Sequence, residues 1–291
     1  MQLQFLGTSA AEGWPGMFCN CDQCETARLL GRKNIRTRSQ AVLYADSVGS
    51  GGIDDILLID FPPDTYTHVV QHGLRLDRVG HLIVTHSHDD HFDPKEFFYR
   101  CGKFTNPALT SPLHIYGNEK VQEKFNSALS HLDQEEWPLG IKLHVAENFV
   151  PFTAGSYTVT PMPALHDPQE RCLIYMIESG GPGQSSVKRM IYGTDTGIFP
   201  EEVFEFIAGK SFDLITLDCT HCSNSEGTNH MGLPDAAELK RRLDIMGCLK
   251  PNTKIVLQHF SHYNGTYYDA MVELAAPHAM DVAYDGGVWE I

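Results

Sequence analysis

A cluster of histidines and aspartates that directly follows a hydrophobic segment constrains this 291-residue chain more than any other feature. The hydrophobic run Val79-Gly-His-Leu-Ile-Val84 predicts a buried strand, and the chain continues as Thr85-His-Ser-His-Asp-Asp-His91. In an extended segment His86 and His88 point to the same side, and a turn can direct the two residues that end the motif elsewhere. Imidazole nitrogens and carboxylate oxygens suit divalent transition metals. The spacing therefore indicates two adjacent metal ions rather than a histidine-rich surface loop.

Short apolar segments and helical patterns alternate along the rest of the chain. Strands are expected at 2–6, 40–45, 55–60, 80–85, 112–116, 141–146, 156–162, 171–178, 188–193, 213–218, 254–258 and 281–284, and helices at 64–73, 94–101, 118–131, 200–208, 234–246 and 266–275. No long linker or fixed-period repeat interrupts this alternation. The pattern predicts a single α/β domain over residues 1–291.

The charge balance restricts the class of partner. The chain has 22 basic and 37 acidic residues, a net charge of −15. Such a surface repels polyanions, which disfavours nucleic acid but not a small anionic substrate held by metal. No apolar run approaches the ~20 residues of a membrane span, and the N-terminus lacks a signal sequence. We expect a cytoplasmic protein without a membrane partner, and a homodimer stays open.

The motif His-x-His-x-Asp-His after a strand resembles that of the metallo-β-lactamase superfamily. This resemblance implies a further histidine, an aspartate and a last histidine downstream, each after a strand. His166, Asp195 and His259 occupy such positions. Read alone, Asp195 is equally a turn residue within Gly-Thr-Asp-Thr-Gly. The implied fold is a four-layer αββα sandwich of two mixed sheets with outer helices.

The resemblance also implies a role for each of these residues. One metal ion would be held by His86, His88 and His166, the second by Asp90, His91 and His259, and Asp195 would bridge the two. Asp60, after the apolar segment 56–59, would orient the metal loop without binding the ions, although its own context equally suits a helix N-cap. Zinc or manganese is expected, with iron as an alternative.

Such a site predicts hydrolysis without a protein nucleophile. Two divalent ions about 3.5–4 Å apart can share a water and lower its pKa, so that hydroxide exists at neutral pH. Within the superfamily, an aspartate at the position of Asp195 is typical of phosphodiesterases and thioesterases rather than of lactam-cleaving members. We therefore expect a metal-dependent phosphoric diester hydrolase, in which Asp90 and His230 act as catalytic residues.

Three of the eight cysteines fall within six residues, in Phe-Cys-Asn-Cys-Asp-Gln-Cys. Thiolates at Cys19, Cys21 and Cys24 suit three corners of a tetrahedral zinc, and we expect His262 as the fourth ligand. Three ordinary cysteines in a loop are the alternative. Buried thiols without a role are the preferred interpretation of Cys219 and Cys222.

Together with the metal motif, this cysteine loop resembles the phosphoribosyl 1,2-cyclic phosphate phosphodiesterases of the carbon–phosphorus lyase pathway. The shared segments are Gly7-Thr8, the cysteine loop, Asp218-Cys-Thr-His221 and Asn229-His230. The resemblance implies that a structural zinc ties the N-terminal loop to His262. It also implies that His230 contacts the substrate phosphate and assists proton transfer. Without the resemblance, a helix-capping or surface histidine is an equally good interpretation.

Extra length relative to that family is expected near 46–54, 102–111, 132–140 and 222–228. The predicted function is cleavage of a small phosphodiester, including a cyclic ribose phosphate. The alternatives are an RNA 3′-end-processing endonuclease or a thioesterase of the same superfamily, and a non-catalytic metal-binding sensor.

Overall fold

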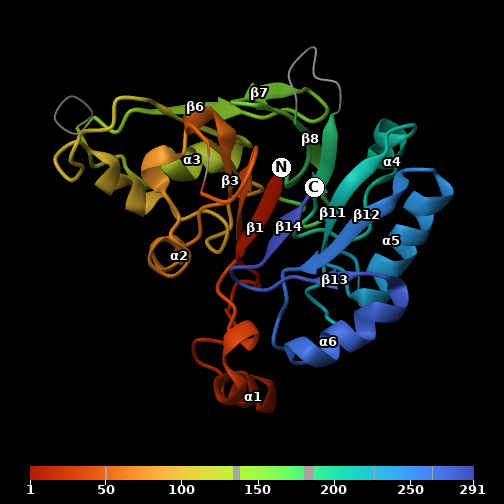
Figure 1. Cartoon of the computed structure of the whole chain (residues 1–291). Coiled ribbons are helices and arrows are strands. Elements are labelled where there is room, and N and C mark those ends of the chain that lie inside the picture. The colour runs from red at the N-terminus through yellow and green to blue at the C-terminus, as the bar shows by residue number, and fades with distance from the viewer. Residues whose placement is uncertain (50, 134–137, 180–186, 226, 264) are drawn as a thin grey trace.

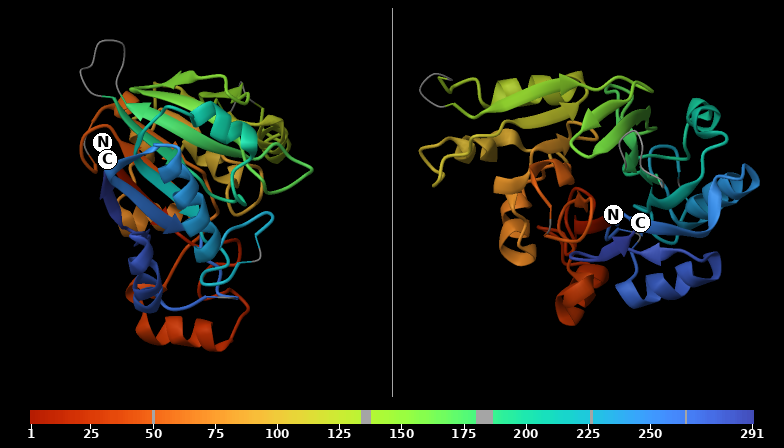
Figure 2. Two further views of the ribbon diagram at one scale, coloured as in Figure 1. Left: turned by 90° about the vertical axis from the view of Figure 1, so that its right-hand side faces the viewer. Right: turned by 45° about the horizontal axis from the view of Figure 1, so that its top comes forward.

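Two seven-stranded sheets pack face to face in the computed structural model, which describes residues 1–291 except 50, 134–137, 180–186, 226 and 264. The strand orders are β14-β1-β2-β3-β4-β5-β6 and β13-β12-β11-β10-β9-β8-β7. Helices cover the outer faces, as the two views in Figure 2 also show. The predicted αββα sandwich is confirmed. Parts of the segments 46–54, 132–140 and 222–228, which we expected to be extra, lie outside the described residues.

All twelve expected strands form. The first sheet contains β1 (Gln2–Gly7), β2 (Gln40–Tyr44), β3 (Ile56–Ile59), β4 (His81–Ile83), β5 (Leu113–Gly117), β6 (Ile141–Val145) and β14 (Val288–Glu290). The second contains β7 (Phe152–Ala154), β8 (Tyr157–Pro163), β9 (Leu173–Ser179), β10 (Lys188–Tyr192), β11 (Phe212–Asp218), β12 (Leu249–Gln258) and β13 (Asp281–Val282). The prediction omitted β7 and β14, because three residues are too few to establish an alternating pattern.

The helices are α1 (Asp22–Leu30), α2 (Thr65–His72), α3 (Glu119–Ala128), α4 (Glu201–Ile207), α5 (Leu233–Ile245) and α6 (Tyr268–Ala275). Two predictions need correction. The segment expected as an α-helix at 94–101 is a 3₁₀ helix, η4 (Pro94–Arg100), whose three consecutive aromatic residues have low α-helix propensity. The second is that no helix was expected at α1, which begins within the cysteine segment and contains Cys24. Among the described residues, no helix is long and apolar enough to cross a membrane.

Three apolar layers hold the sandwich together. Residues of both sheets, such as Leu57 and Tyr175, form a fully buried cluster between them. A second cluster lies under α4, α5 and α6, and a third under α3 and η4. Because both of its faces are covered, β3 is buried along its whole length.

Parallel strand pairs bring the expected ligands to one edge of the sandwich. β3 and β4 are parallel, as are β10, β11 and β12, so their carboxyl ends point the same way within each sheet. Asp60, Asp195 and His259 each follow such a strand, with φ angles of 63°, 45° and 64°. Positive φ at residues other than glycine costs about 1–3 kcal/mol each and clusters at functional sites. This edge is therefore the candidate site.

Stability is expected to fall with acid partly through His68, a fully buried residue of α2. Burial and the nearby His72 lower the pKa of His68 to about 3. Because only the unfolded chain takes up a proton between pH 6.5 and 3, the stabilisation is complete above pH 6.5 and is lost as the pH falls. At pH 5 the loss from this group is about 2 kcal/mol. Urea unfolding at pH 7 and pH 5 gives the drop in the free energy of unfolding between the two pH values. This drop should be smaller by about 2 kcal/mol in His68→Gln than in the wild type. An equal drop in both proteins would contradict the role of His68.

Candidate metal centre

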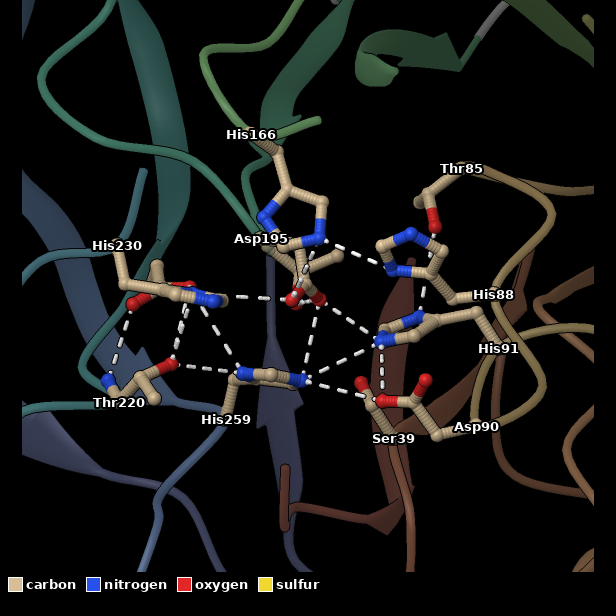
Figure 3. A network of polar contacts seen from close by, with 12 residues as sticks. Ser39, Thr85, His88, Asp90, His91, His166, Asp195, Thr220, His230 and His259 are labelled. Carbon is tan, nitrogen blue, oxygen red and sulfur yellow. Dashed lines mark hydrogen bonds and ion pairs between the residues drawn. The ribbon is translucent and has the colours of Figure 1, made fainter. Parts of the chain in front are cut away.

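The structure brings together all seven residues predicted to bind the active-site metals. Figure 3 labels His88, Asp90, His91, His166, Asp195 and His259 among them. Potential ligand atoms lie within 4.8 Å of one another in three groups made of these residues, which are His86, His88 and His166; Asp90, His91 and His259; and His86, His91 and Asp195. A fourth group joins Asp195 and His259 to Asp218 and His230. The first two groups are those expected for the two ions. Asp195 belongs to the third and lies between them.

The side chains converge on common points. His88 Nδ1 is 3.2 Å from His166 Nε2, and His91 Nε2 is 3.2 Å from His259 Nε2. Asp195 Oδ2 lies 2.8 Å from His91 Nε2 and 3.1 Å from His259 Nε2, while its Oδ1 lies 3.7 Å from His166 Nε2. The Nε2 atom of His86 is buried without a hydrogen-bond partner. Nitrogens and oxygens that face one another in this way fit divalent metal ions.

The electrostatics of the centre lead to the same conclusion. Asp60, Asp90, Asp195 and Asp218 are buried, and within the described part of the chain their ion-pair partners are histidines alone. Burial would raise the pKa of Asp195, but His259 and His91 hold it well below its usual range. Several buried carboxylates without lysine or arginine need positive charge from elsewhere, which two divalent cations would supply.

Asp60 lies behind the metal loop, as expected. Its carboxylate accepts hydrogen bonds from the Thr85 amide at 2.8 Å, the Thr85 hydroxyl at 3.0 Å and His91 Nδ1 at 2.8 Å. The bond to Nδ1 leaves Nε2 of His91 to face the centre, which is how such a carboxylate orients a metal-binding histidine. The alternative role as a helix N-cap is wrong, because Asp64 is the N-cap residue of α2.

Asp218, for which no role was predicted, lies beside the centre. Its Oδ2 accepts a hydrogen bond from His230 Nδ1 at 2.9 Å, and its Oδ1 accepts one from the Thr220 amide at 2.9 Å. The Thr220 hydroxyl in turn lies 2.8 Å from His259 Nδ1. Asp218 lies at the end of a buried strand, much as Asp60 directly follows one. This position is what the sequence offered as a sign of a role at the site.

His230 lies where it can meet both the centre and solvent. Its Nδ1 is 3.7 Å from Asp195 Oδ1, and its side chain is 17% exposed. Although burial opposes it, the Asp218 carboxylate raises the pKa of His230 to about 9. The ring is held by hydrogen bonds on one nitrogen and remains accessible.

Two acidic side chains on the segment after His166 hold the metal loop from the other side. Glu170 accepts hydrogen bonds from the Ser87 amide and hydroxyl, both at 2.7 Å. Asp167 Oδ2 lies 3.2 Å from His88 Nε2. The sequence left Asp167 without a role, and it did not single out Glu170.

We expect Asp218→Asn to weaken the centre without unfolding the protein. Asparagine keeps the size of the side chain but removes the charge that orients both His230 and His259, the latter through Thr220. Substituting a residue that orients a metal-binding histidine typically changes metal affinity or activity by about 10–100-fold. Titration with zinc in competition with a chelator, alongside Asp213→Asn at the far end of β11, measures the effect. Equal affinities in the two variants would refute it.

The second expected metal group also assembles. The potential ligand atoms of Cys19, Cys21, Cys24 and His262 lie within 4.8 Å of one another. His262 Nδ1 is 3.8 Å from Cys19 Sγ and 3.6 Å from Cys21 Sγ. Although burial opposes it, hydrogen bonds from the Cys24 backbone and neighbouring side chains lower the pKa of Cys21 to about 7. Three thiols and one imidazole suit a tetrahedral zinc.

The other conspicuous thiols belong to the core. Cys219 and Cys222 are fully buried, as expected. Burial raises the pKa of both, that of Cys222 to about 12. Thiols of this kind are unreactive.

Comparisons with known proteins agree with this arrangement. The family model described as the beta-lactamase superfamily domain matches residues 57–260. The chain is 22% identical over 251 residues to coenzyme PQQ synthesis protein B of Acinetobacter baumannii (strain AYE), covering 78% of this chain and 75% of that protein.

Solved structures share the whole fold. A diphosphatase of the PhnP family superposes with a TM-score of 0.74 at 18% identity, covering 100% of this chain and 96% of the other. The Zn²⁺-bound PqqB of Methylobacterium extorquens superposes with a TM-score of 0.69 at 16% identity, with both chains covered completely. At these identities the likeness establishes the fold.

Proposed function

Because this chain belongs to the beta-lactamase superfamily, we propose that it is a metal-dependent hydrolase that cleaves a small phosphodiester. One observation carries the proposal: the Asp195 carboxylate lies between two groups of histidines and beside His230, which is paired with Asp218. The first part of this arrangement suits two metal ions. The second provides a proton donor next to them.

The proposed chemistry divides between the ions and the chain. Two bound divalent ions would activate water and offset charge on the phosphoryl oxygens. Asp195 and the histidines would fix the positions of the ions, and Asp60 would hold His91 with Nε2 toward them. His230, whose Nδ1 is engaged by Asp218, would present its other nitrogen to the substrate and protonate the leaving oxygen.

Three considerations favour a phosphodiester. Carboxylates shared between ions give a hard, oxygen-rich site, which suits the oxygens of a phosphoryl group. The PhnP-family relative is a diphosphatase, so phosphorus–oxygen cleavage is a reaction that this fold supports. A net charge of −15 disfavours an RNA substrate. Within this class, a cyclic ribose phosphodiester is the substrate we favour.

The proposal extends to the surroundings of the site. Cys19, Cys21, Cys24 and His262 would bind a structural zinc. All eight cysteines are free, which suits a reducing compartment such as the cytoplasm.

Hydrolysis of a substrate panel tests the proposal. Protein reconstituted with zinc or manganese would be given an aryl phosphodiester, a ribose cyclic phosphate, a thioester and a β-lactam, with His86→Ala as the control. We expect phosphodiester turnover that His86→Ala abolishes, with preference for the cyclic substrate. Turnover of the thioester alone would overturn the phosphodiesterase assignment. Bound metal without any turnover would instead favour a sensor.

A further inference from the structure

A pocket of about 190 Å³ lies on the outer face of the first sheet, between the strands and η4. Its apolar lining comprises Leu58, Phe61, Leu76, Val79, Leu82, Phe97, Leu109 and Leu113. An engineered apolar cavity of about 150 Å³ is known to hold benzene. The volume therefore accommodates one aromatic ring or a branched chain of similar size.

Two residues of the lining, Arg100 and Thr105, carry polar atoms without partners. The Nε of Arg100 and the hydroxyl of Thr105 are buried and make no hydrogen bond. The Arg100 guanidinium donates to the Ser111 carbonyl at 2.6 Å through Nη2, but it has no carboxylate partner among the described residues. A half-buried guanidinium with a free N–H is a strong donor for an anionic oxygen.

The two acidic residues of the lining do not neutralise Arg100. Asp77 is already paired with Arg75, which donates to it at 2.8 and 2.6 Å. Glu96 is exposed. The pocket thus joins an apolar cavity to one unpaired positive charge, in a chain whose net charge is −15.

We propose that this pocket binds a small carboxylate that carries an aromatic or branched apolar group. The apolar group would pack against Leu82 and Phe97, and the carboxylate would accept hydrogen bonds from Arg100 Nε and the Thr105 hydroxyl. This is a second ligand site, separate from the metal centre, and it requires nothing of the proposed hydrolysis.

Phe61 connects the pocket to the metal loop, so that a bound ligand would restrain the loop. Its ring lines the pocket and stacks on Phe97 with ring centroids 4.2 Å apart. Its amide donates to the His91 carbonyl at 2.7 Å, and its carbonyl accepts from the Asp93 amide at 2.7 Å. A ligand that restrains Phe61 would slow opening of these two hydrogen bonds. The pocket is therefore placed to act as an effector site.

Calorimetric titration with phenylacetate tests the proposal, with the neutral phenylacetamide as the matched probe. For a ligand of this size we expect a dissociation constant of about 1 mM or tighter. Arg100→Met keeps the apolar stem but loses the charge, so it should weaken phenylacetate about tenfold and leave phenylacetamide unchanged. Arg241→Met, the same change on the exposed face of α5, should behave as the wild type.

A second variant locates the site independently of Arg100. Leu109→Trp places a larger side chain in the lining of the pocket and should abolish binding of both probes. Hydrogen exchange of the Phe61 and Asp93 amides should slow when phenylacetate is added to the wild type. No saturable binding to the wild type, or binding that survives Leu109→Trp, would overturn the proposal. Neither substitution touches a proposed metal ligand, so these outcomes are independent of the hydrolase assay.

Discussion

Asp195→Asn is expected to lower phosphodiester hydrolysis by about 10³-fold or more, with loss of metal from the centre. The Asp195 carboxylate touches both histidine groups, with Oδ2 between His91 and His259 and Oδ1 toward His166. An amide cannot supply two anionic oxygens, and its NH₂ would face imidazole nitrogens that need a cation. Metal assistance is worth several kcal/mol of transition-state stabilisation, and each 1.36 kcal/mol is a factor of ten in rate.

Rates with the aryl phosphodiester and metal content by mass spectrometry measure this effect together. Asp213→Asn is the matched control. Asp213 is a partly buried carboxylate with lysine partners, and it lies at the amino-terminal end of β11, away from the site. It should keep the wild-type rate and metal content. Retained hydrolysis in Asp195→Asn at full metal occupancy would show that the bridge is dispensable, and the dinuclear proposal would then fail.

The centre was predictable because its ligands follow strands that the sequence shows clearly. Short apolar runs, 82–84 and 255–257, lead to His86 and His259, and a side chain at the end of such a strand lies at the edge of the sheet. The αββα arrangement followed from the ligand order of a family that the motif resembles. In the structure, the side chains of all seven residues lie close together at that edge.

What the sequence did not disclose depends on tertiary contacts. The roles of Asp218 and Glu170 exist only because distant segments meet: Asp218 reaches His230, and Glu170 reaches Ser87. The position of Asp218 at the end of a buried strand marks it as a candidate but does not name its partner, and no spacing distinguishes Glu170 from a solvent-exposed glutamate. The pocket beside Arg100 is of the same kind, because its lining comes from three strands and η4.

The two metal groups are not independent of each other. His259 and His262 lie three residues apart on the segment after β12. Phe260 lies between them, and its amide donates to the Thr8 carbonyl. The next residue, Ser9, forms an isolated β-bridge with Phe260. With both proposed metal sites occupied, the cysteine group would hold one end of this segment and the active-site group the other. Losing the first should therefore disturb the second.

Cys24→Ser is expected to remove the structural zinc and to lower the free energy of unfolding by about 4 kcal/mol or more. Cys24 is fully buried in the first turn of α1, and its Sγ accepts a hydrogen bond from the Gly16 amide at 3.2 Å. Without zinc, Cys19 and Cys21 would be left with weak thiol contacts to His262 Nδ1 in place of metal bonds. The same loss should displace His259, so we also expect about tenfold slower hydrolysis that added active-site metal does not restore.

Cys248→Ser separates this effect from the cost of burying a hydroxyl. Cys248 is equally buried but lies away from both metal groups, where its thiol faces the Ile207 carbonyl. It should keep its full metal content and lose only about 1 kcal/mol, the usual cost of a single core change. Urea unfolding and metal analysis of the two variants, side by side, give the answer. If Cys24→Ser retained its zinc, or lost it without a larger loss of stability than Cys248→Ser, the cysteine group would not be the structural anchor proposed. A slower rate at unchanged stability would instead show that the zinc acts on His259 alone.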